Sequence, residues 1–329
     1  MKDNILAIGV SHREYFRIML SYYPKNLSEN FDIFLFVDNK KEILDDIKEI
    51  ISEFDIPIFN NAKIVVNSEM ISEYSEKLNL TKNGQKFAYQ FGACFKLLVP
   101  IYLKEKYNKT KIFAIDDDIF ILDDLSYIFE NYNGWVFKKE NLFVLKNSDK
   151  FKVLEEFNSI FQFDFNLEEI NNLSLNSGTI LYDIDDEYKS QVKRFIENTY
   201  IQNIFFNNSG FTAWTLEQRF QHFNMHYLMA KNRGVKLFVS KEVRLVDQVG
   251  KEQIGKNYLK KVVPSIIHYA IGVKKPLWLR KFIPGIKWKY NIDYKPKYEL
   301  KNILYNKDWK PKRFKIVHEE KKKNFKSLF

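Results

Sequence analysis

Short apolar runs alternate with segments of helical spacing through the first third of the chain. The strand-like runs span residues 4–10, 31–37, 62–66 and 111–115. The helical segments span residues 13–23, 41–54 and 85–106. A repeated strand–helix order indicates a mostly parallel sheet with helices on its faces. The pattern predicts an α/β, Rossmann-like domain that binds ligands beyond the carboxyl ends of its strands.

The later half of the chain is less regular. Strands are expected at residues 173–182, 235–239 and 265–269. Helices are expected at residues 186–200 and 215–231. The first of these strands contains Ser177-Gly178, which predicts a break within it.

Positive charge gathers at the C-terminal end. Residues 273–329 hold 18 Lys and Arg against 5 Asp and Glu, and residues 1–272 hold 34 against 37. The net charge of +10 therefore comes from this last segment. We expect one domain over residues 1–272 and a basic, aromatic extension over residues 273–329.

Aromatic residues alternate with the lysines of the extension, among them Trp278, Trp288 and Trp309. Trp favours the membrane–water interface, where each basic residue near an anionic leaflet contributes about 1 kcal/mol. Aromatic side chains between cations also stack on nucleic-acid bases. Packing against the body with the lysines in solvent is a third alternative. An anionic membrane surface is the favoured partner, and nucleic acid is not expected.

The sequence gives no sign of membrane insertion or secretion. No run approaches the roughly 18 apolar residues of a membrane span, and the N-terminus carries no cleavage pattern. The single cysteine, Cys94, excludes an intrachain disulfide, as is typical of a reducing compartment. We expect a cytoplasmic protein that is peripheral at the inner face of the membrane.

Three consecutive carboxylates, Asp116, Asp117 and Asp118, follow the apolar run 111–115 directly. In an extended backbone Asp116 and Asp118 share one face, and Asp117 points to the other. Unpaired charge at the end of a buried strand is costly, and carboxylate oxygens suit Mg²⁺ or Mn²⁺. We therefore expect a divalent-cation site on Asp116 and Asp118. The following pair, residues 123–124, fits helix capping instead.

Five motifs in order resemble the retaining glycosyltransferases of family 8, which have the GT-A fold. They are the helix that carries Lys96, the D-x-D of Asp116 and Asp118, Asn176-Ser177-Gly178, Glu217-Gln218, and His268 followed by Gly272 and Lys275-Pro276. The resemblance spans about residues 4–278. Glu217 stands where the family has Asp, and one extra residue separates His268 from Gly272. The resemblance implies a GT-A fold and transfer of a sugar from a nucleotide diphosphate.

The resemblance also implies roles for single residues at the metal and the diphosphate. Asp116, Asp118 and His268 would bind the metal, and imidazole favours Mn²⁺ over Mg²⁺. Lys275 would contact the diphosphate, and Gly272 would allow close backbone approach. A core histidine and a solvated lysine are the alternatives for His268 and Lys275.

Further residues would surround the donor sugar and nucleoside. Lys96 would point at the donor, Gln218 would lie near the anomeric carbon, and Glu217 would orient sugar hydroxyls. The remaining expected contacts are Asn176 to the sugar and Val10, Ser11 and Asp38 beside the nucleoside. Ordinary first-turn helix positions are the alternative for Glu217 and Gln218.

The leading interpretation is a metal-dependent, retaining hexosyltransferase that uses a UDP-linked sugar. Its acceptor would be a glycan or glycolipid in bacterial capsule or lipooligosaccharide synthesis. A nucleotidyltransferase or phosphohydrolase could use the same carboxylates, but would release pyrophosphate or phosphate. A non-catalytic nucleic-acid-binding module would bind through the basic extension, with salt-sensitive affinity.

Overall fold

The computed structural model divides the chain into two compact units. The first comprises residues 1–11, 28–116 and 126–239, and the second comprises residues 12–27, 117–125 and 240–329. The structure describes residues 4–10, 30–37, 44–45, 47–49, 51, 61–91, 94–109, 111–116, 119–121, 125, 129–130, 132, 134–140, 150–207, 213–238, 245–246 and 266–268.

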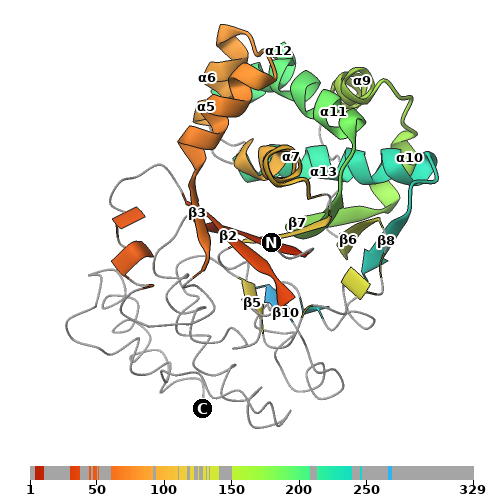
Figure 1. Ribbon diagram of the computed structural model, residues 1–329. Helices are drawn as coiled ribbons and strands as arrows, with labels where there is room; N and C mark the ends of the chain where they lie inside the picture. The colour runs from red at the N-terminus through yellow and green to blue at the C-terminus, as the bar shows by residue number, and fades with distance from the viewer. Residues whose placement is uncertain are drawn as a thin grey trace, which may run out of the picture. The chain divides into compact units, whose positions relative to one another are not determined.

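A seven-stranded sheet forms the centre of the first unit, in the order β3-β2-β1-β4-β7-β6-β8 (Figure 1). Its strands are β1 (Ile5–Val10), β2 (Asp32–Val37), β3 (Lys63–Val66), β4 (Lys111–Asp116), β6 (Trp135–Glu140), β7 (Ser174–Asp183) and β8 (Val235–Phe238). β7 runs antiparallel to β4 and β6, and the other four pairings are parallel. The predicted α/β class with a mostly parallel sheet is confirmed.

The central strands β1 and β2 are apolar and buried over almost their whole length. Every residue of β1 is buried, and so is every residue of β2 after Asp32. Near-continuous apolar runs of this kind are typical of parallel strands that are buried on both faces. Alternate side chains, including Ala7 and Phe36, join one core cluster with the helices.

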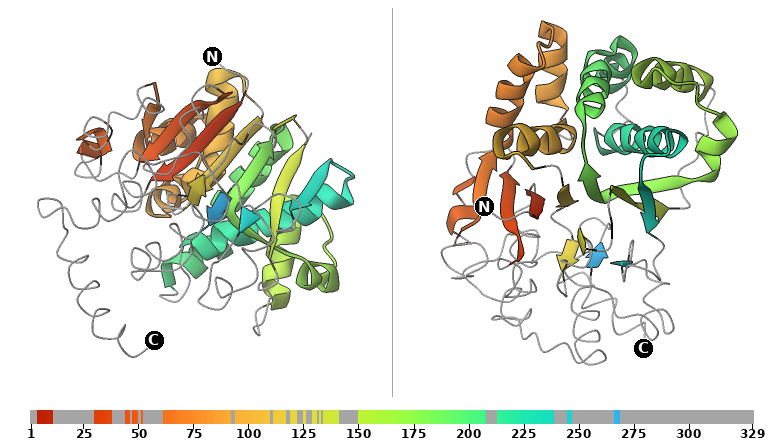
Figure 2. Two further views of the ribbon diagram at one scale, coloured as in Figure 1. Left: turned by 90° about the horizontal axis from the view of Figure 1, so that it is seen from below. Right: turned by 45° about the vertical axis from the view of Figure 1, so that its right-hand side comes forward.

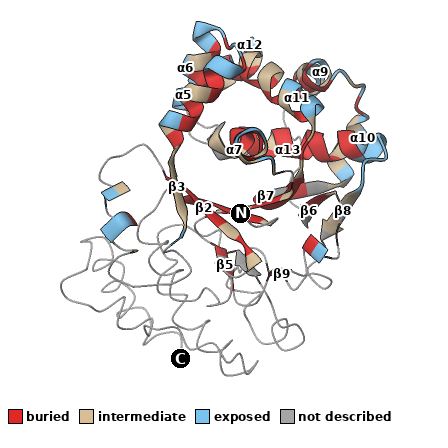
Figure 3. Ribbon diagram, viewed as in Figure 1, coloured by how far each residue is buried: buried red, intermediate tan, exposed pale blue. Residues whose placement is uncertain are grey.

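The helices of the first unit form two rows over the sheet. The helices are α5 (Asn67–Lys77), α6 (Lys82–Gln90), α7 (Cys94–Tyr107), α9 (Lys150–Phe161), α10 (Leu167–Asn172), α11 (Asp186–Glu197), α12 (Thr199–Asn207) and α13 (Ala213–Ala230). α7 and α13 lie next to the sheet, with α5, α6, α11 and α12 further out (Figures 1 and 2). Figure 3 shows α7 and α13 largely buried, whereas exposed residues lie along α6 and α10.

Two helix predictions were wrong in length. The expected helix over residues 85–106 is two helices, α6 and α7, because Phe91 leaves the helical conformation at φ −79° and ψ 82°. Its ring is fully buried and stacks on Phe87 with centroids 4.9 Å apart, so core packing fixes the turn. The expected helix over residues 186–200 ends at Glu197. Asn198 then turns the chain, and its side chain accepts a 2.9 Å hydrogen bond from the N–H of Ile201.

The expected break in the strand at 173–182 takes the form of a bulge within a continuous β7. Phe137 of β6 pairs with Ile180, but the next residue, Lys138, pairs with Asn176. The three residues 177–179 therefore have no counterpart on β6. A bulge redirects side chains where a sheet borders a site.

The second unit contains a small three-stranded sheet. β10 (Ile266–His268) lies between β5 (Ile119–Ile121), to which it is antiparallel, and β9 (Leu245–Val246), to which it is parallel. The strand predicted over residues 265–269 is confirmed by β10. The helix expected at residues 13–23, the capping pair 123–124 and the domain boundary after residue 272 lie outside the described residues.

Within the part of the chain that the structure describes, we find no helix with the length and apolar character needed to cross a bilayer.

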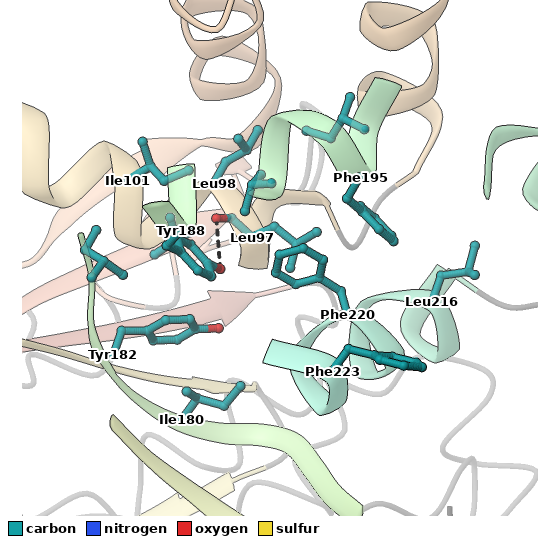
Figure 4. Packing of buried hydrophobic residues seen from close by; sticks show 14 of the residues in the cluster. Leu97, Leu98, Ile101, Ile180, Tyr182, Tyr188, Phe195, Leu216, Phe220 and Phe223 are labelled. Carbon is teal, nitrogen blue, oxygen red and sulfur yellow. Dashed lines mark hydrogen bonds between the residues drawn. The ribbon is translucent and has the colours of Figure 1, made fainter. Parts of the chain in front are cut away.

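Aromatic side chains fill the core between the sheet and the two inner helices. Phe157 stacks on Phe223 with ring centroids 4.1 Å apart, and the ring centroids of Trp135 and Tyr188 are 5.3 Å apart. Figure 4 shows Tyr182 and Tyr188 in this core beside apolar residues of α7 and α13. This core joins the elements that carry the candidate site.

Candidate active site

A small cavity lies at the carboxyl ends of β1 and β4, beside the bulge of β7. Phe36, Phe95 and Val99 contribute apolar lining, and Lys96 and Asp116 contribute charge. The chain places β2 on one side of β1 and β4 on the other, so strand order reverses between β1 and β4. Open α/β sheets bind ligands at such a switch point.

Gly9 shapes one wall of this cavity. A Cβ atom at Gly9 would come within 2.7 Å of the ring of Phe95, so a side chain there would displace the ring. Val10, the residue expected beside the nucleoside, is buried and points to the other face of β1 by strand alternation. Among residues of β1, Ala7 and Gly9 line the cavity and Val10 does not.

Lys96 lies between two carboxylates. Its Nζ is 2.6 Å from Oδ1 of Asp116 and 3.9 Å from Oε2 of Glu217. The side chain of Asp116 is 26% exposed, whereas that of Glu217 is 0% exposed. Three elements meet here, because Lys96 belongs to α7, Asp116 ends β4 and Glu217 lies in α13. The cation thus connects a carboxylate that solvent reaches with one that it does not.

The pKa of the buried Glu217 carboxyl lies well above its usual value. Desolvation raises the pKa of Glu217 to about 7, although Lys96 and the hydroxyl of Ser177 lower it, and Asp116 raises it. Ser177 Oγ donates a 2.7 Å hydrogen bond to Oε2. Among the described residues, Oε1 of Glu217 has no hydrogen-bond partner. A buried acceptor in this condition is stabilised by any further donor.

Gln218 is anchored at the base of the bulge. Its Nε2 donates a 2.7 Å hydrogen bond to the backbone carbonyl of Leu175, and its side chain is 9% exposed. The bond fixes the orientation of the amide. Ser177 and Gln218 together tie the first turns of α13 to β7.

The structure brings together Lys96, Asp116 and Glu217, with Gln218 adjacent in the chain. For Asn176 and His268 it describes the backbone alone: Asn176 pairs with Lys138, and His268 pairs with Ile119. The other predicted residues lie outside the described part, namely Ser11, Asp38, Asp118, Gly272 and Lys275.

Sequence reasoning gave no role to Ser177 or Tyr182, which both line the cavity. Ser177 stands in the same Asn-Ser-Gly segment that drew attention to Asn176. The sequence feature that could have indicated a role for Ser177 is its hydroxyl next to a predicted strand break. Tyr182 had no signal, because an aromatic residue in a buried strand is ordinary core. Burial raises the pKa of the Tyr182 hydroxyl well above its usual range, so it stays protonated.

Asp116 is the predicted metal ligand whose side chain the structure describes. Asp116 offers a half-buried carboxylate at a strand end. In the second unit, His268 is the register partner of Ile119, the residue that follows Asp118 in the sequence. The side chains of Asp118 and His268 lie outside the described residues. Among the described residues there is no group of three His, Cys, Asp or Glu side chains placed to hold an ion.

No protein-family model matches the chain, and no curated protein matches it. Among solved structures, the chain is similar to galactosyltransferase LgtC in complex with donor and acceptor sugar analogues. The identity is 12%, the TM-score is 0.46, and the match covers 90% of this chain and 97% of that one. Mouse xyloside xylosyltransferase 1 matches at 11% identity and TM-score 0.44, over 82% and 97% of the two chains. Glycosyltransferase GlyE of Streptococcus pneumoniae matches at 13% identity and a TM-score of 0.41. The match covers 91% of this chain and 66% of that one.

Proposed function

We propose that this protein is a metal-dependent glycosyltransferase that takes a sugar from a nucleotide diphosphate. One observation carries the proposal: Lys96 lies between the strand-end Asp116 and the buried Glu217, at the switch point of the sheet. Such a donor has a diphosphate that leaves with negative charge and a sugar whose hydroxyls must be oriented. The site offers a cation for the first and a buried carboxyl for the second.

Lys96 and the expected metal ligands act on the diphosphate in this proposal. Transfer leaves negative charge on the departing diphosphate. We assign Lys96, which lines the cavity beside Asp116, to stabilise that charge. A divalent cation held by Asp116, Asp118 and His268 would supply further Lewis-acid stabilisation of the same charge.

Glu217 and Gln218 act on the sugar in this proposal. We assign Glu217 the orientation of the sugar hydroxyls. Because its side chain is 0% exposed in this structure, contact with the sugar requires Oε1 to become accessible when the donor binds, while Ser177 holds Oε2. The amide of Gln218 is held by Leu175 and is a weak nucleophile, so we assign it orientation of the sugar. Binding energy from these contacts positions the reacting carbon.

The finer parts of the proposal rest on the sequence. They are a UDP-linked hexose donor, retention of configuration, Asn176 at the sugar, and Ser11, Asp38, Gly272 and Lys275 at the nucleotide. A glycan or glycolipid acceptor of bacterial capsule or lipooligosaccharide synthesis fits the basic, aromatic extension of residues 273–329. That extension would hold the enzyme at the inner face of the membrane.

Release of nucleoside diphosphate tests the proposal. The protein is incubated with a panel of nucleotide sugars, with Mn²⁺ or with EDTA, and the products are separated by chromatography. We expect nucleoside diphosphate from at least one donor, with Mn²⁺ only. Asp118→Ala is expected to abolish this release and to leave the unfolding transition intact, because it removes a metal ligand.

A matched control is Asp186→Ala, which removes a carboxylate that is 98% exposed at the start of α11. It is expected to retain full release. Release that continues in EDTA would contradict the metal dependence. Phosphate or pyrophosphate as the product would favour a phosphohydrolase or a nucleotidyltransferase and would refute glycosyl transfer.

A further inference from the structure

A chain of buried hydrogen bonds runs beneath the cavity and joins α13 to α7. Gln221 of α13 donates from Nε2 to the hydroxyls of Tyr182 at 3.2 Å and Tyr188 at 3.3 Å. Tyr188 of α11 in turn donates to the backbone carbonyl of Leu97 in α7 at 3.3 Å, the dashed line in Figure 4. The side chains of Gln221, Tyr182 and Tyr188 are at most 1% exposed.

The α7 end of this chain lies at the turn that carries Lys96. Leu97 is the next residue after Lys96, and Pro100 lies within the same helix. Proline has no N–H, so Pro100 cannot donate to the carbonyl of Lys96, and its ring crowds that carbonyl. The turn therefore has one intrahelical bond fewer than its neighbours. The hydroxyl of Tyr188 donates to the next carbonyl of this turn, that of Leu97, from outside the helix.

The α13 end of the chain lies one turn from Glu217. Residues 217 and 221 are four apart, so their side chains lie on the same face of the helix. Asn224 donates to Oε1 of Gln221 at 3.5 Å, which leaves Nε2 directed at the two tyrosines. The same amide therefore fixes α13 against β7 through Tyr182 and against α7 through Tyr188.

We propose that Tyr188 and Gln221 are positioning residues that set where Lys96 lies relative to Glu217. The inference rests on the proposed function only for its catalytic consequence. Neither residue touches the donor in this account. Tyr188 and Gln221 act through α7, by holding the turn of Lys96 at the spacing where its Nζ serves both Asp116 and Glu217.

A double-mutant cycle between Tyr188→Phe and Lys96→Met tests the proposal. Tyr188→Phe keeps the ring and removes the hydroxyl, so the turn of Lys96 loses its outside bond. We expect donor turnover, as kcat/KM per folded molecule, to fall about tenfold in the background with Lys96. In the Lys96→Met background the same change is expected to alter it less than twofold, because the cation to be positioned is gone.

The same cycle measured by urea unfolding needs no substrate. We expect the effects of the two changes on the unfolding equilibrium constant to be non-additive by at least about threefold, since neighbours in one network couple. Additive effects in unfolding would overturn the positioning role. A wild type that turns over no nucleotide sugar, together with non-additive unfolding, would refute the proposed function and leave the positioning role standing.

The matched control is Tyr227→Phe. The Tyr227 hydroxyl also joins α13 to α11, through Glu187, but makes no contact with the turn of Lys96 among the hydrogen bonds of the described residues. The effects of Tyr227→Phe and Lys96→Met on the unfolding equilibrium constant are expected to be additive. If Tyr188→Phe does not fold, Gln221→Met removes the other donor of the network and takes its place in the cycle. Coupling of the control equal to that of Tyr188 would overturn the proposal.

Discussion

Replacing Lys96 by methionine is expected to lower donor turnover by about 10²–10³-fold. The substitution keeps most of the volume of the side chain but removes the cation beside Asp116 and Glu217. Loss of one fixed group that stabilises developing negative charge costs a factor of this size. The measurement is kcat with saturating nucleotide sugar and Mn²⁺, followed by the release of nucleoside diphosphate.

Lys104→Met is the matched control for Lys96→Met. Lys104 lies in the same helix, and its Nζ is 3.3 Å from Oδ1 of the exposed Asp186 on α11. Its loss removes an exposed ion pair, which is worth little, so turnover is expected to stay within twofold of the wild type. Equal losses in the two variants, or normal turnover in Lys96→Met, would contradict the role assigned to Lys96.

Glu217→Gln is expected to change how the free energy of unfolding depends on pH. Burial raises the pKa of Glu217 from 4.5 to about 7. Between these values the folded protein keeps a proton that the unfolded chain has released, so the wild type loses stability as pH rises. Glutamine cannot ionise and escapes this loss. From pH 5 to pH 8 the difference in unfolding free energy should move about 2 kcal/mol in favour of the variant.

Urea unfolding at several pH values measures this difference. Glu155→Gln on the exposed face of α9 controls for the loss of one negative charge, and it is compared with the wild type at the same pH values. A difference between Glu217→Gln and the wild type that stays constant from pH 5 to pH 8 would contradict the raised pKa. Turnover should also fall in Glu217→Gln, because the amide presents a donor where the proposal needs an acceptor.

The sheet could be predicted because its signals are local. Apolar runs at β1, β2 and β4 are long enough and bounded clearly enough to mark buried parallel strands. Their order along the chain then places the ends of β1 and β4 at the switch point. Asp116 follows from the same local signal, because it ends an apolar run, whereas Lys96 and Glu217 were expected from the family resemblance.

Other features depend on contacts between distant segments and have no local signal. The turn at Phe91 forms because its ring packs on Phe87 and Phe205, and the latter is more than 100 residues away in the chain. The bulge of β7 appears only in its register with β6. The network of Tyr188 and Gln221 joins four elements through residues that look like ordinary core. Helical periodicity alone could not show any of these.

In the proposed function, Asp116 takes part in a site for a divalent cation and a nucleoside diphosphate. Thermal unfolding with UDP tests it most directly, because a ligand that binds the native state stabilises it. At about 100 times its Kd, UDP with Mn²⁺ is expected to raise the Tm of the wild type by about 5 °C. UDP with EDTA is expected to raise it by less than 1 °C, as is UDP with Mn²⁺ in Asp116→Asn. An equal rise in EDTA, or in Asp116→Asn, would contradict the account.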